Sequence, residues 1–186
     1  FRNRALSLLA YQDNAFLAKE QAKSAKNMTD QLSAFSTVIK HNPSSEHINL
    51  FYDQWKHERL VIDKWFSAQV LTAHPKTLNN VVNNLTSHSD FTITTPNRVR
   101  SILGAFPANT AGFHLETGEN YKLFSDWILK IDPVNPQVGA KMCSAFETWK
   151  RYDPKRQKLI KSQIDRVLNA GSISKDAKEM LNRLIS

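Results

Sequence analysis

The chain has 186 residues, of which 41% are hydrophobic and 10% aromatic, and it carries a formal net charge of +8. This composition predicts a folded, soluble globular protein and excludes a disordered chain. No run of about 18 apolar residues is present, so we expect no membrane span. Cys143 is the single cysteine, which excludes an internal disulfide or a multi-cysteine metal site and fits a reducing cytoplasm.

The first ten residues combine basic and apolar residues but lack the small-residue cleavage pattern of a signal peptide, so we interpret them as a helix. A first residue that is Phe1 rather than Met suggests a piece of a longer chain. The basic residues are scattered, with clustering only from Lys150 to Lys161. That cluster contains an acid and a proline, so a solvated helical surface explains it and we expect no nucleic-acid partner.

Apolar residues recur with a helical period along the first part of the chain. The first predicted helix covers residues 2–12, with Ala5, Leu8, Leu9 and Gln12 on one side, and the second is capped by Asn14 and runs to about Ser24. The third is opened by Thr29 and Asp30 and ends before Pro43. The fourth is capped by Ser44 or Ser45, and the fifth continues to the break at His74 and Pro75. The fourth helix has a stripe of bulky apolar residues that predicts firm burial: Ile48, Phe51, Tyr52 and Trp55. Around His57 to Arg59 we expect either a kink or a short turn.

The second part of the chain continues the helical pattern. One predicted helix covers residues 76–88, the next begins at Pro96, and an irregular stretch follows from Pro107 to Gly118. A helix bearing Tyr121 and Phe124 comes next, and then a helix capped by Asn135 whose apolar stripe reaches Trp149. The last two helices are one that begins at Asp153 and is closed by Gly171, and one capped by Ser174. The β-branched residues 92–95 are too few for a sheet and are followed by proline. About ten helices in antiparallel pairs predict an all-α irregular α-solenoid (HEAT/armadillo-like) or a multi-layer bundle.

The stretch from Pro96 to Phe106 has a well-marked start, because Thr95 suits an N-cap and proline suits the first helical position. Its apolar residues fall on one face of a regular helix: Val99, Ile102, Leu103 and Phe106. Arg98 and Arg100 lie two positions apart and therefore project to different sides. Arg98 is interpreted as a surface or ion-paired residue, whereas Gly104 leaves bare backbone beside Arg100.

No pattern of catalytic or metal-binding residues is complete. His57 and Glu58 begin an H-E-x-x-H motif, but Val61 stands where zinc needs the second histidine. The remaining histidines are dispersed, which favours capping or surface roles: His41, His47, His74, His88 and His114. We therefore predict no catalytic residue and no metal site within this chain.

Two helix starts carry cations that oppose the helix dipole, an unfavourable placement that function can explain. Arg100 lies in the second turn after Pro96, while Gln137 and Lys141 follow Pro136 and share a helix face because they are four residues apart. If both starts lie at the same end of the bundle, they would offer donors to a carboxylate or a peptide carbonyl.

Several segments together resemble the C-terminal region of bacterial aminopeptidase N, a family of gluzincin, zinc-dependent alanyl aminopeptidases. These segments are NMTD, FYDQWKHERLVIDKWFSAQ, PNRVRSILGAF, FHLETGENY, NPQVGAKM and RYDPKRQKLIKSQ. The resemblance covers essentially the whole chain in order. It implies that residues 1–186 form a single helical, superhelical unit, a fragment of the C-terminal domain of a longer multidomain cytoplasmic peptidase. Its first helices would expose surfaces meant for a missing upstream part.

The resemblance also implies a role for this unit. The family's zinc-binding and substrate-anchoring motifs belong to a separate upstream catalytic domain, so the isolated chain should be no peptidase, whereas the parent enzyme should be a zinc metallo-aminopeptidase, a hydrolase acting on peptides. The C-terminal domain would enclose the active-site chamber and contact the primed side of the peptide through Arg100, Gln137 and Lys141. Lys141 stands where the family typically has arginine, and a lysine acts as a point charge rather than a bidentate fork. The alternative is a stand-alone helical scaffold that binds a peptide or protein in its concave face.

Overall fold

The computed structural model describes all 186 residues, and its regular secondary structure is helical throughout, with no β-strand. The chain divides into two compact units, residues 1–74 and residues 75–186. The all-α prediction is confirmed. None of the helices combines the length and the hydrophobicity that a membrane span requires.

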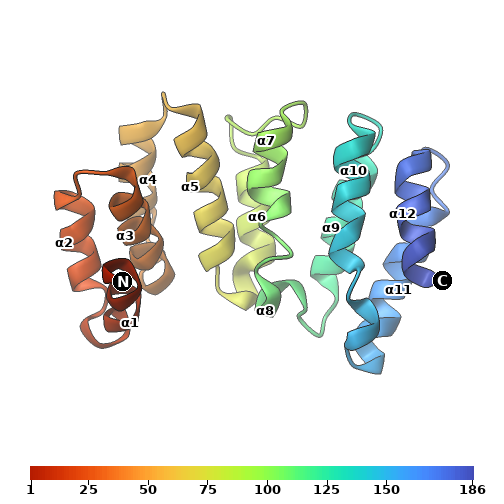
Figure 1. Cartoon of the computed structure of the whole chain (residues 1–186), viewed down its shortest axis with the longest axis horizontal. Coiled ribbons are helices and arrows are strands. Elements are labelled where there is room, and N and C mark those ends of the chain that lie inside the picture. The colour runs from red at the N-terminus through yellow and green to blue at the C-terminus, as the bar shows by residue number, and fades with distance from the viewer. The chain divides into compact units, whose positions relative to one another are not determined.

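The first unit contains five helices, drawn from red to yellow in Figure 1. They are α1 (Arg2–Asp13), α2 (Phe16–Ser24), α3 (Met28–His41), α4 (Ser45–Trp55) and α5 (Arg59–Thr72). Helix α3 is central, because it packs against each of the other four. The core between α1, α2 and α3 is built from small and medium apolar side chains: Leu6, Ala10, Ala15, Ala18, Ala34 and Val38.

The junction of α1 and α2 corrects one sequence prediction. Asn14 does not cap the second helix; it ends α1 in the left-handed region with φ 52°, and Ala15 follows with φ 60°. Asparagine tolerates this conformation better than other non-glycine residues, so it terminates a helix as readily as it starts one. Between α4 and α5 the structure has a turn rather than a kink, since Trp55 ends α4 and α5 begins at Arg59.

The buried face of α1 also differs from the prediction. Leu6 and Ala10 face the core, whereas Leu8 and Leu9 are 64% and 44% exposed. Both faces of this helix carry leucines, so the apolar period did not define its orientation. The stripe on α4 is less buried than expected: Phe51 is 6% exposed and stacks on Phe35, and the other three stripe residues are half-buried.

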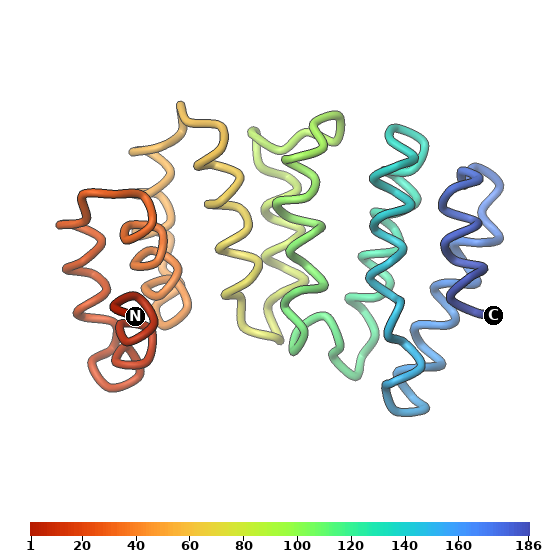
Figure 2. The backbone as a smooth tube through the Cα atoms, viewed as in Figure 1, coloured from red at the N-terminus to blue at the C-terminus, as the bar shows by residue number.

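The second unit contains seven further α-helices. They are α6 (Leu78–Thr86), α7 (Pro96–Val99), α8 (Thr110–Phe113), α9 (Glu119–Ile131), α10 (Pro136–Cys143), α11 (Pro154–Leu168) and α12 (Lys175–Ile185). Helix α10 packs against α9 and α12, and α9 packs against α11. Consecutive long helices of this unit run up and then down, as the tube in Figure 2 shows for α9 to α12.

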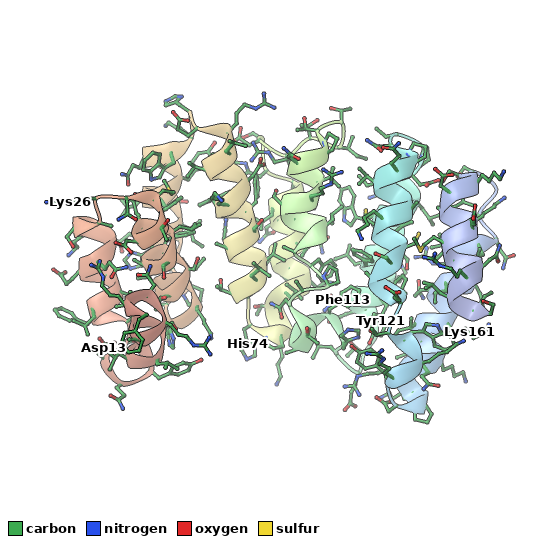
Figure 3. The ribbon with its side chains drawn as sticks, viewed as in Figure 1. Asp13, Lys26, His74, Phe113, Tyr121 and Lys161 are labelled. Atoms are coloured by element: carbon green, nitrogen blue, oxygen red, sulfur yellow. The ribbon has the colours of Figure 1, made fainter.

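Aromatic rings form the core around α8 and α9. Phe113 makes edge-to-face contacts with Phe106, Tyr121 and Phe124, with ring centroids 5.3 to 5.4 Å apart. Phe113 and Tyr121 are labelled beside each other in Figure 3. Such pairs are favourable beyond the apolar area they bury. This cluster holds the otherwise irregular segment before α9 in place.

Helix ends in the second unit match the prediction in part. Asp153 and Ser174 cap α11 and α12 through their side chains, as predicted. Gly171 does not close α11, because that helix already ends at Leu168 with Asn169 as its cap. The glycine with positive φ is instead Gly118, at the start of α9, with φ 70°.

Candidate functional site

The segment after Thr95 is only partly the regular helix that its sequence predicts. Pro96 begins α7, but the Thr95 side chain makes no capping hydrogen bond. From Arg100 to Gly104 the backbone widens into a π-helical turn. The predicted core residues are nevertheless all buried: Val99, Ile102, Leu103 and Phe106. Helix propensities do not distinguish a single π-helical turn from an α-helical one, so the sequence did not predict it. Such turns are frequent at functional sites.

The two arginines of this segment have opposite environments. Arg98 is only 7% exposed, so it is not a surface residue, and of the two predicted alternatives the ion-paired one stays a prediction. The methylene stem of an arginine packs well against apolar neighbours, which makes such burial possible. Arg100 is exposed, and no side chain of the chain forms an ion pair or hydrogen bond with its guanidinium.

Helix α10 supplies the second group of predicted site residues. The side chain of Asn135 accepts a hydrogen bond from the backbone N–H of Val138 at 3.1 Å, which confirms it as the N-cap. The helix ends at Cys143, so the predicted stripe does not reach Trp149 in one continuous helix. Two 3-10 turns follow instead, over Ser144–Phe146 and Trp149–Arg151.

A cavity of about 180 Å³ brings Arg100 and Lys141 together at one site. Apolar and small residues form the rest of its lining: Val99, Leu103, Gly104, Pro107, Phe124, Val138, Met142, Ser144 and Ala145. A Cβ added at Gly104 would lie 3.7 Å from the Cβ of Arg100, which is an ordinary van der Waals contact. Gln137 is exposed on α10 and does not line the cavity.

The chemistry of this cavity is that of an anion site with an apolar wall. Neither Arg100 nor Lys141 has an anionic partner within the chain, so both charges are available to a ligand. A guanidinium binds a carboxylate through two parallel hydrogen bonds, whereas an ammonium contributes a point charge. The volume is below the roughly 300 to 1,000 Å³ of pockets that enclose a whole small molecule. The cavity therefore suits one end or one side chain of a larger ligand.

A histidine between two tyrosines lies in the same unit and was missed by sequence reasoning. Nδ1 of His114 lies 2.8 Å from the hydroxyl of Tyr121, and Nε2 lies 2.8 Å from the hydroxyl of Tyr152. Burial, followed by the nearby Arg156 charge, lowers the pKa of His114 to about 4. Burial also raises the pKa of Tyr121 to about 12, so the phenol keeps its proton.

Arg156 fastens this cluster to the start of α11. Its Nε donates to the backbone carbonyl of His114 at 2.7 Å, and its Nη1 donates to the carboxylate of Asp153 at 2.6 Å. Both nitrogens of the imidazole are occupied by hydroxyl groups, so the ring has no free position for a substrate. The cluster is a structural connection: His114 is the C-cap of α8, and its half-buried ring is held by two hydroxyl groups.

Two further hollows, both in the first unit, also carry cations: Lys19 and Lys23 line one, and Arg4 and Lys40 line the other. A larger hollow of about 610 Å³ lies in the first unit between α2, α3 and α4, over Phe35 and Phe51. The basic stretch from Lys150 to Lys161 is partly ion-paired, with Arg156 on Asp153 and Lys161 on Asp165. No group of three or more His, Cys, Asp or Glu side chains could hold a metal ion.

The helices define a helical-repeat domain, and its second unit carries a small cavity lined by two cations, Arg100 and Lys141. The chain belongs to the family described as a domain of unknown function (DUF3458_C) with ARM repeats, which matches residues 1–186. This match agrees with the predicted solenoid-like arrangement.

The chain is also similar to parts of several aminopeptidases. The chain is 33% identical over 164 residues to aminopeptidase N of Caulobacter vibrioides, and 32% identical over 191 residues to aminopeptidase N of Escherichia coli. These alignments cover 87% and 100% of this chain but 19% and 22% of those proteins. The crystal structure of Legionella pneumophila aminopeptidase A in complex with aspartic acid superposes with a TM-score of 0.90 and 30% identity, over 98% of this chain and 22% of that one. The chain thus spans about a fifth of these proteins and matches their C-terminal helical region.

Proposed function

We propose that this chain is the non-catalytic C-terminal domain of a zinc aminopeptidase, and that it encloses the active-site chamber and contacts the primed side of the peptide substrate. The parent enzyme removes N-terminal residues from peptides in the cytoplasm. Arg100 and Lys141 bind carboxylate or carbonyl oxygens of the peptide, and Gln137 adds an amide donor from the exposed face of α10.

The observation that carries this proposal is the pair of unpartnered cations at one apolar cavity. Arg100 comes from the wide turn after α7, and Lys141 comes from α10. Cations left without an internal anion cost little when exposed, yet two of them beside buried apolar residues form a surface that favours an amphiphilic anion. A peptide that carries a carboxylate next to an apolar side chain has this chemistry.

Zinc belongs to the upstream part of the parent enzyme in this proposal. The histidines and acids of the chain are dispersed and do not fit a zinc site. The contribution of this chain to the reaction is therefore binding and orientation, which lowers the barrier by holding the peptide in place rather than by reacting with it.

The proposal is tested by metal analysis and peptidase assays of the 186-residue chain beside the full-length protein. We expect about one zinc per full-length molecule, as in catalytic zinc sites with three protein ligands, and activity only in that protein. Activity in the 186-residue chain would overturn the proposal. A full-length protein without peptidase activity that still binds peptides would favour a helical binding scaffold instead.

A further inference from the structure

A buried junction beneath α10 joins three segments of the second unit. Asp132, which follows α9, is fully buried, and its carboxylate accepts two hydrogen bonds from Ser174. The backbone N–H of Ser174 donates at 2.6 Å and the hydroxyl donates at 2.7 Å. The carboxylate thus lies at the N-terminus of α12, where a negative charge is favourable.

The hydroxyl of Ser174 has a second partner, because it also accepts from the backbone N–H of Ala177 at 3.2 Å. It therefore caps α12 while it donates to Asp132. Both hydrogen-bonding functions of this hydroxyl are used, which fixes its orientation and that of the carboxylate. No ion pair forms at Asp132, so these hydrogen bonds and the helix terminus stabilise a buried charge.

Gly139 lets α10 lie directly on this carboxylate. A Cβ at residue 139 would lie 2.6 Å from Oδ1 of Asp132 and 2.8 Å from its Cα. Because the second of these atoms is backbone, the clash could not be relieved by a side-chain rotation, and α10 would have to move. Cys143, at the C-terminal end of α10, is fully buried, and the charge of Asp132 acts on its thiol.

Gly139 lies midway between Gln137 and Lys141 on this short helix, and Val138 and Met142 of the same helix line the cavity with Lys141. We infer that Asp132, Gly139 and Ser174 are positioning residues that set the depth of α10 and hence the place of Lys141 beside Arg100. This inference rests on the proposed function, because it gives the junction a role in peptide binding. Because Lys141 would bind the peptide without reacting with it, its displacement should raise KM and leave kcat unchanged.

The test compares KM and kcat of full-length variants on peptides and on a single-residue chromogenic substrate. For Gly139→Ala and Ser174→Ala we expect the KM for peptides to rise about three- to tenfold with kcat nearly unchanged, and the KM for the chromogenic substrate to stay near wild type. Ser174→Thr keeps the hydroxyl and should restore the KM for peptides. These results together would support the inference.

Gly112→Ala is the matched control for simple loss of packing. A Cβ at Gly112 would also lie 2.6 Å from a neighbouring atom, but that atom is Cδ2 of Leu78, outside the junction. It should lower the melting temperature without changing the KM for peptides. If Gly139→Ala and Ser174→Ala lower the melting temperature but leave the KM for peptides unchanged, the inference is overturned.

Arg100→Ala separates the two proposals. If this variant raises the KM for peptides while both junction variants leave it unchanged, the junction has no positioning role and the proposed function stands. If Arg100→Ala and Lys141→Ala both leave the KM for peptides unchanged, the proposed function fails, and the role inferred for the junction fails with it. Ser174→Ala is the milder junction variant and keeps the test valid if Gly139→Ala does not fold.

Discussion

The imidazole of His114 lies 2.8 Å from the hydroxyl of Tyr121, and this contact ties the segment before α9 to α9 itself. The other ring nitrogen reaches Tyr152, just before α11, at the same distance. Burial favours the neutral ring, because the imidazolium would lose its hydration and face the Arg156 guanidinium. The cluster should therefore be sensitive to acid.

We predict that the second unit loses stability as the pH falls from about 6.5 to about 4. The pKa of His114 is about 4 in the folded chain and 6.5 ordinarily, so the unfolded chain binds the proton first. The favourable contribution of the neutral ring is thus present above pH 6.5 and is lost across this window. Each unit of pKa shift corresponds to about 1.4 kcal/mol of stability if the group is fully shielded from solvent. Since the ring is only half-buried, we expect a total loss of about 1 to 2 kcal/mol, which is less than this value summed over the whole shift.

His114→Gln is the matched control for this acid effect. Glutamine can donate and accept hydrogen bonds but does not titrate, so its stability curve should be flatter between these pH values. Thermal unfolding of both chains by circular dichroism measures the difference. Parallel curves for wild type and His114→Gln would show that other groups cause the acid loss.

Cys143 should be unreactive in the folded protein at neutral pH. Its thiol is fully buried, and burial followed by the Asp132 charge raises its pKa to about 12. Because the thiolate is the reactive form, alkylation should be slow in native buffer and complete in denaturant. Mass spectrometry after brief exposure to iodoacetamide tests this. Rapid native labelling would mean that α10 opens from its neighbours.

The helix starts at Pro96 and Pro136 should respond differently to changes at the residues that precede them. The side-chain oxygen of Asn135 accepts a hydrogen bond from the Val138 N–H, whereas the Thr95 side chain makes no such bond. Asn135→Ala should therefore cost about 1 kcal/mol of local stability in α10, and Thr95→Ala clearly less at α7. Hydrogen exchange of the peptides that cover each helix start measures both. Equal losses would contradict the assignment of the caps.

The core of the second unit was predictable because it depends on local spacing. Val99 and Ile102 are buried as their period requires, and Pro136 begins a helix behind a capping Asn135. From spacing alone, Arg100 and the residues of α10 would share a site only if both helix starts lie at the same end of the bundle. The family resemblance implied that they do share one. Arg100 and Lys141 do line one cavity.

The features that the sequence did not predict depend on contacts between distant residues. His114 meets Tyr152, 38 residues away, and Asp132 meets Ser174, 42 residues away. Neither pair leaves a periodic signal, and a single glycine such as Gly139 is indistinguishable from a weak helix residue until its neighbour is known. The burial of Arg98 likewise follows from tertiary packing, which overrides the usual preference of a charge for the surface.

The proposed contact with the primed side of the peptide depends on the Arg100 guanidinium, which Arg100→Ala removes. A charge-assisted hydrogen bond contributes about 1.5 to 3 kcal/mol, so Arg100→Ala in the full-length enzyme should raise the KM for peptides about tenfold or more. The KM for single-residue chromogenic substrates should change little, because these lack a primed side. Arg59→Ala, which removes an exposed arginine of the first unit, should leave both values unchanged. An equal effect of Arg100→Ala on both substrate classes would contradict the primed-side role.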